Sequence, residues 1–198
     1  YTAEGREDDL VGALIGTGEL TEQEIANIAT ALLLAGFVTL VNMLALGTYC
    51  LLAHPEQLAR LRAEPDLVDG AVEELLRYLS IIHIGPTRVA SQDLELAGQT
   101  IKAGDMVTVS TSAVNRDPEK FEDPDTLDIH RHAQGHTGFG HGIHQCLGQQ
   151  LARIEMRIGY HELIQRYPGL RLAIPADQVK LRTDMAIYGV HELPVTWE

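Results

Sequence analysis

The chain has 198 residues, 45% of them hydrophobic, and is therefore long enough to bury a sizeable core. Its formal net charge of −13 argues against nucleic acid or an anionic membrane as the main partner. The two cysteines, Cys50 and Cys146, stand far apart in different contexts, which argues against a disulfide framework and favours a reducing compartment. The first ten residues are polar and acidic and lack a secretory signal pattern, so we expect a cytoplasmic protein.

The N-terminal quarter of the chain predicts a short helix followed by a long one. We expect the short helix at residues 9–15, followed by a turn. Thr21 and Glu24 have the spacing of a capping box, which marks the start of the long helix. That helix is predicted to end before His54, because proline follows at position 55 and disfavours helical geometry in the preceding residue.

The long helix is strongly apolar, and residues 28–53 contain no charge. A run of this length is compatible with a membrane span. However, no Lys or Arg closely flanks either end, and threonine and asparagine interrupt the apolar surface. We therefore interpret it as a helix through the middle of a large domain, with no membrane partner.

The remaining elements predict a mainly α protein with small β-sheets. Amphipathic helices are expected at residues 56–63 and 68–79, and the latter carries Glu74 and Arg77 on one face, because they are three positions apart. A hairpin around 97–99, a strand at 106–111 and a short helix at 112–115 follow. The last helix is predicted from Leu147 to Arg166, and residues 170–197 favour strands.

The most informative stretch is 139–148, in which an aromatic residue and glycines precede a cysteine and a predicted helix start. Glycines at 138, 140 and 142 allow the backbone to pass close to a bulky group. Amide groups of a helix beginning near Leu147 would point at the sulfur of Cys146 and favour the metal-binding thiolate. A small buried cysteine is the plainer alternative for this position.

The full pattern, Phe139-Gly140-x-Gly142-x-His144-x-Cys146-x-Gly148, resembles the haem-ligand loop of the cytochrome P450 family, specifically its bacterial soluble members. The resemblance implies the C-terminal half of a single cytochrome P450 domain over residues 1–198, with the long central helix and the haem-ligand loop, and with the N-terminal half absent. It also implies haem b as cofactor, with Cys146 as the axial ligand of the iron. Phe139, Gly140 and Gly148 would belong to the cofactor-binding loop.

Two further residues match positions that bind the haem propionates in this family, namely Arg88 and His144. A guanidinium suits a carboxylate, because it donates two parallel hydrogen bonds. Within the long helix, residues 35–39 resemble the oxygen-binding kink of the family. Gly36 would make room for dioxygen and Thr39 would bond to a carbonyl one turn back. Val38 departs from the pattern, because the family has an acid there.

Glu74 and Arg77 resemble the family's buried structural ion pair. The third partner of that pair is usually an Arg or His, but the expected position holds Thr126. Phe37, Ile82 and Ile187 are candidates for an apolar substrate pocket, the last in a pocket-lining turn that the resemblance places near residues 185–188.

The resemblance therefore implies a monooxygenase that hydroxylates or epoxidises a lipophilic small molecule, such as a secondary metabolite, with dioxygen and electrons from a ferredoxin and its reductase. Two alternatives stay open. One is a degenerate binding module or an incomplete fragment, completed by the missing N-terminal half. The other is a zinc site, because five histidines and Cys146 fall within residues 130–146.

Overall fold

The computed structural model describes residues 9–198, and contacts within the chain group its residues into two compact units. The first unit extends to Leu40 and the second comprises Val41–Glu198. One long helix, α2 (Glu22–Ala53), contributes residues to both units. The acidic residues before Asp9 lie outside the described part of the chain.

The helix ends of the first unit follow from their capping residues. Helix α1 (Leu10–Thr17) begins after Asp9, whose carboxylate accepts a hydrogen bond from the Gly12 amide at 2.8 Å, and it ends at Gly18 in the left-handed conformation. The capping box before α2 is present: the Thr21 amide donates to the Glu24 carboxylate at 2.8 Å, and the Glu24 amide donates to the Thr21 hydroxyl. The predicted start of the long helix is thus confirmed.

Helix α2 is long and apolar enough to cross a membrane by length and composition, with a window of mean hydropathy 2.1. Only 11% of that window is buried within the chain. The buried residues all lie toward the C-terminal end of α2, between Asn42 and Leu51. The interpretation of α2 as a buried core helix is therefore confirmed only for that end.

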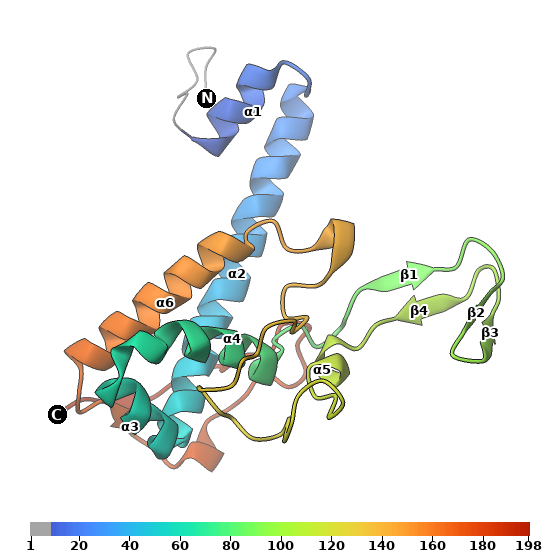
Figure 1. The fold of residues 1–198 in the computed structure, drawn as a ribbon. Helices are drawn as coiled ribbons and strands as arrows, with labels where there is room; N and C mark the ends of the chain where they lie inside the picture. The colour runs from blue at the N-terminus through green and yellow to red at the C-terminus, as the bar shows by residue number, and fades with distance from the viewer. Residues whose placement is uncertain (1–8) are drawn as a thin grey trace. The chain divides into compact units, whose positions relative to one another are not determined.

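The core of the second unit is formed by this end of α2 together with α3 (Pro55–Ala63), α4 (Val68–Leu79) and α6 (Gln149–Arg166). A short 3-10 turn, η1 (Pro65–Leu67), joins α3 to α4, and α4 packs against α6 (Figure 1). The buried Tyr160 hydroxyl of α6 donates to the Met43 carbonyl at 2.6 Å. Gly47 permits this approach, because a Cβ at that position would collide with the Tyr160 hydroxyl oxygen.

Two small antiparallel sheets lie between α4 and the cysteine-containing stretch in the sequence. Strand β1 (Thr87–Val89) pairs with β4 (Met106–Thr108), and β2 (Leu94–Leu96) pairs with β3 (Gln99–Ile101) at the far end of the β1/β4 ribbon (Figure 1). The predicted hairpin at 97–99 is a two-residue turn in which Ala97 and Gly98 both have positive φ. Helix α5 (Thr111–Val114) follows, close to its predicted place.

The chain ends in short extended segments, as predicted. Strand β5 (Arg171–Leu172) pairs with β6 (Val195–Thr196), and the 3-10 turn η3 (Ala176–Gln178) lies between them in the sequence. Two isolated bridges occur in this region. Ile82–Ile187 joins it to the segment after α4, and Leu181–Val190 joins two of its own parts. Together with the helices, these elements confirm the predicted mainly α fold with small sheets.

Candidate functional site

The cysteine loop, defined here as residues 136–149, turns sharply on two glycines. Gly140 and Gly142 have φ values of 73° and 75°, which other residues rarely adopt. The 3-10 turn η2 (Gly142–His144) precedes the cysteine. The Cys146 amide then donates to the Phe139 carbonyl at 2.8 Å, so the loop closes on itself between these two residues.

Helix α6 begins at Gln149, two residues later than predicted, with Gly148 as its N-cap. Gln145, directly before the cysteine, is extended, so the 3-10 turn does not continue into α6. Within residues 9–198 no hydrogen bond reaches the Cys146 sulfur, and the expectation that helix amides point at it stays a prediction. The Gln149 amide donates a weak bond to the Cys146 carbonyl, at 3.4 Å.

The two cysteines differ in a way that suits one of them to a large prosthetic group. Cys146 is an exposed free thiol, and a Cβ added at Gly142 or Gly148 would meet no atom within 4 Å. The loop therefore leaves open space on its surface, as a haem-binding loop requires. Cys50 is buried, and burial raises the pKa of its thiol to about 12, so that it stays protonated.

The two predicted propionate ligands are exposed side chains of the second unit. Arg88 lies on β1 and donates only to the neighbouring Thr87 carbonyl, at 2.9 Å; it has no carboxylate partner within the described residues. His144 ends η2, two residues before Cys146, and is also exposed. A cation without an acidic partner and an exposed imidazole fit an acidic group of a cofactor.

The predicted pair of Glu74 and Arg77 is present and completely buried, with 0% exposure of both side chains. The guanidinium donates two hydrogen bonds to the carboxylate, at 2.7 and 2.8 Å. It also donates to the carbonyls of Asn115 and Pro124, both at 2.8 Å. Arg77 thus ties α4 to the irregular segment before the cysteine loop.

The third side chain of this cluster is Arg131, whose Nε donates to Glu74 at 3.2 Å. The placement of the third partner at Thr126 is therefore corrected. Thr126 participates through its backbone, because its carbonyl accepts from Arg77 and from Arg131. A threonine side chain cannot supply the positive charge that the Glu74 carboxylate requires once it is buried, whereas a guanidinium can.

In the first unit, the Thr39 hydroxyl donates to the Ala35 carbonyl at 2.6 Å, the bond expected from the sequence. Helix α2 is nevertheless uninterrupted there. Thr30 and Thr48 make the same bond one turn back, to Ala26 and Leu44. The bond alone therefore does not distinguish Thr39 from other helical threonines, and its role, like that of Gly36, stays a prediction.

Of the three predicted pocket residues, two are brought together. Ile82 and Ile187 form an antiparallel bridge, and the Tyr188 amide donates to the Ile81 carbonyl at 2.7 Å. His83 stacks on the Tyr188 ring with a centroid separation of 4.5 Å. Phe37 belongs to the first unit and is exposed. Binding of a substrate by these residues stays a prediction.

The histidines near Cys146 do not form a metal site in residues 9–198, where no three His, Cys, Asp or Glu side chains are placed to hold an ion. One of these histidines contacts an acid on α4 instead, since His136 Nε2 lies 3.0 Å from the Glu73 carboxylate. The zinc alternative therefore lacks a ligand set in the described part of the chain.

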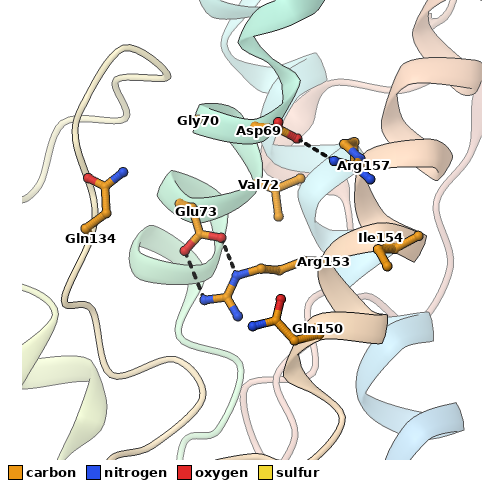
Figure 2. Close-up of a pocket in the computed structure, with 9 residues that line it drawn as sticks. All are labelled: Asp69, Gly70, Val72, Glu73, Gln134, Gln150, Arg153, Ile154 and Arg157. Atoms are coloured by element: carbon orange, nitrogen blue, oxygen red, sulfur yellow. Dashed lines mark hydrogen bonds and ion pairs between the residues drawn. The ribbon is translucent and has the colours of Figure 1, made fainter.

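Four charged residues at the interface of α4 and α6 were not predicted as functional, namely Asp69, Glu73, Arg153 and Arg157. Glu73 binds Arg153, and Asp69 binds Arg157 one turn away, so two ion pairs join α4 to α6 (Figure 2). Burial alone would raise the pKa of Glu73, but hydrogen bonds from His136 and Arg153 outweigh it and lower that pKa to about 2. In the sequence, Asp69 and Glu73 are four residues apart, and so are Arg153 and Arg157. This matching spacing was the available signal for the two ion pairs.

These residues line a cavity of about 300 Å³ between α4 and α6 (Figure 2). None of the site residues predicted from the sequence lines it. Both acids and both arginines around it are engaged with one another, as the dashed ion pairs in Figure 2 show. Its lining is formed by Asp69, Gly70, Val72, Glu73, Gln134, Gln150, Arg153, Ile154 and Arg157.

Comparison with known sequences shows which family the chain matches. Residues 4–185 match the family described as Cytochrome P450. The chain is 54% identical over 191 residues to cytochrome P450 105C1 of a Streptomyces species, covering 96% of this chain and 50% of the relative. It is 53% identical over 194 residues to pentalenic acid synthase of Streptomyces avermitilis, covering 98% and 48%. The chain thus spans about half the length of the curated relatives it matches.

Solved structures lead to the same family. The chain superposes with a TM-score of 0.93 on Streptomyces peucetius CYP105P2 in complex with a biphenyl compound, at 48% identity, covering 96% of this chain and 49% of that one. CYP105P1 in complex with filipin I gives a TM-score of 0.93 at 49% identity, again covering 96% and 49%. With its family match over residues 4–185 and its high identity to members of that family, this chain belongs to the cytochrome P450 family.

Proposed function

We propose that this chain supplies the haem-binding half of a haem-thiolate monooxygenase, and the exposed thiol of Cys146 carries this proposal. Haem b held by the Cys146 thiolate would supply the chemistry that cleaves dioxygen. Arg88 and His144 would hold the propionates, and Phe139, Gly140 and Gly148 would shape the loop. The open surface around Gly142 and Gly148 and the absence of an acidic partner for Arg88 in the described residues support this assignment.

In the proposed reaction, one atom of dioxygen enters a C–H or C=C bond of a lipophilic small molecule. The other atom leaves as water, with two protons from solvent and two electrons from a ferredoxin and its reductase. We assign the handling of dioxygen to Gly36 and Thr39, on the likeness of residues 35–39 to the family motif. Phe37, Ile82 and Ile187 are proposed to contact substrate, and the proximity of the last two supports a shared role.

We further propose that the functional unit includes the N-terminal half of the domain and is cytoplasmic. One face of α6 supports this, because apolar side chains along it are exposed although helical spacing places them together. Such a continuous apolar surface is unusual on a soluble protein that acts alone. The exposed fractions along this face are 60% at Leu151, 44% at Ile154 and 56% at Ile158.

The test of the haem assignment is the absorption spectrum of the purified protein, reduced and exposed to carbon monoxide. We expect the band from which the family takes its name, which reports thiolate-ligated haem. Elemental analysis of the same sample distinguishes the alternatives. Zinc without iron would revive the zinc-site alternative, and neither metal would favour a module without redox chemistry.

Replacing Val38 with aspartate is expected to raise the fraction of electrons that end in product. A positioned carboxyl contributes roughly 10²- to 10⁴-fold to proton transfer, so even partial restoration of the acid usual in this family gives a measurable gain. The measurement is product formed per reduced nicotinamide consumed, in the complete protein with its electron donors. The matched control is Val38→Asn, because asparagine has nearly the shape of aspartate but cannot ionise and therefore cannot pass on a proton. Equal coupling in both variants would show that protons arrive by another route.

A further inference from the structure

Glu73 contacts chain segments on both sides of Cys146. His136, ten residues before Cys146, donates from Nε2 to one oxygen of Glu73 at 3.0 Å. Arg153, seven residues after Cys146, donates to both oxygens at 2.6 and 3.1 Å (Figure 2). A single half-buried carboxylate on α4 therefore joins the segment that enters the loop to the helix that leaves it.

On the entering side, the imidazole of His136 is used at both nitrogens. Nδ1 accepts the Gly138 amide at 3.0 Å, so the proton lies on Nε2 and points at Glu73. The backbone at Gly138 is closely fitted, because a Cβ there would lie 3.0 Å from both His136 Nδ1 and the Leu76 carbonyl. The orientation of His136 therefore fixes where the loop leaves the surface of α4.

On the leaving side, the guanidinium of Arg153 lies over the Phe139 ring at 4.6 Å. Phe139 in turn accepts the Cys146 amide on its carbonyl at 2.8 Å. Glu73 thus reaches the backbone of Cys146 through two intermediates, Arg153 and Phe139. Holding the guanidinium in one orientation holds the ring, and the ring belongs to the residue that closes the loop.

We propose that Glu73 is a positioning residue of the cysteine loop, which sets the backbone of Cys146 through His136 and through the Arg153–Phe139 contact. The consequence for the thiolate–haem bond rests on the proposed function. The role is distinct from that of the buried pair Glu74–Arg77, which faces the segment before the loop and touches neither Phe139 nor His136 in the described contacts.

The neighbouring pair Asp69–Arg157 offers a matched control. It also joins α4 to α6, one helical turn from Glu73–Arg153, at 3.5 Å (Figure 2). The pair is more exposed and has no contact with the loop among the described residues. Glu73→Ala and Asp69→Ala each remove one carboxylate from the same helix interface. Only Glu73→Ala removes a carboxylate that contacts a residue of the loop, namely His136.

The experiment compares both variants and Glu73→Gln in the complete protein, with and without haem, by amide hydrogen exchange. In Glu73→Ala we expect peptides from the cysteine loop to exchange roughly tenfold faster than in the wild type, because hydrogen bonds to a charged group are lost. In Asp69→Ala the same peptides should change by about twofold or less, as for an exposed ion pair. Glu73→Gln keeps an acceptor oxygen and should lie between them.

The second readout is the carbon monoxide spectrum of the reduced, haem-loaded variants. Glu73→Ala should show the largest share of haem without the thiolate band, Glu73→Gln less, and Asp69→Ala the wild-type share. Equal loop exchange in Glu73→Ala and Asp69→Ala, or faster exchange spread evenly over the chain, would overturn the inference. A wild-type protein without the thiolate band would instead refute the proposed function and leave the exchange comparison valid.

Discussion

Replacing Cys146 with serine is expected to abolish the thiolate–haem spectrum completely. The thiolate is the metal-binding form of cysteine, and a serine hydroxyl does not ionise at neutral pH to replace it. Cys50 cannot take over, because it is buried in the core and its thiol pKa is raised to about 12. The measurement is the carbon monoxide difference spectrum, normalised to haem content.

The matched control is Cys50→Ala, which removes the other thiol and should leave the spectrum unchanged. This variant trims a buried side chain and is expected to lower stability by about 1–2 kcal/mol without affecting ligation. A thiolate band that survives in Cys146→Ser would show that the iron has another ligand. Loss of the band in Cys50→Ala alone would point to the same conclusion.

Replacing Arg77 with leucine is expected to destabilise the second unit by about 3–5 kcal/mol. The substitution leaves the fully buried Glu74 with Arg131 as its remaining cation and removes the donor from two carbonyls, those of Asn115 and Pro124. Because folded domains are stable by only about 5–15 kcal/mol, this loss removes a large share of the total stability. The midpoint of urea unfolding, followed by circular dichroism, measures the effect.

The control for this prediction is Arg166→Ala, which breaks an exposed pair with Glu162 on α6. Its effect should be below about 1 kcal/mol, because exposed ion pairs contribute little. If both variants shift the midpoint by the same amount, the charge of Arg77 contributes no more to stability than that of an exposed arginine. The cluster with Glu74 would then be held by packing rather than by its hydrogen bonds.

The sequence is most informative where chemistry is local. The capping box at Thr21, the helix from Val68 to Leu79 and the turn at Ala97 each depend on neighbours within a few residues, and the structure confirms all three. The cysteine loop is recognisable for a different reason. Its aromatic residue, its glycines and its cysteine stand close together, so the pattern is dense in a short stretch.

The contacts that sequence reasoning missed are all between distant segments. Arg131 reaches Glu74 across 57 positions, and Arg153 reaches Glu73 across 80. No local pattern distinguishes these arginines from solvated ones, because their partners are set by how α4, α6 and the loop pack. The start of α6 is predicted two residues early for a smaller reason, since a glycine such as Gly148 is a weak sequence signal for an N-cap.

The separation in sequence between Glu73 and its partners bears on the order in which the domain assembles. His136 is 63 residues away and Arg153 is 80 residues away, so neither contact can form from local structure. During synthesis the ribosome releases Cys146 before Arg153, so we expect the contact of Arg153 with Glu73 to form only once α6 docks on α4. We therefore expect capture of the proposed haem to be a late event, tied to the completion of folding.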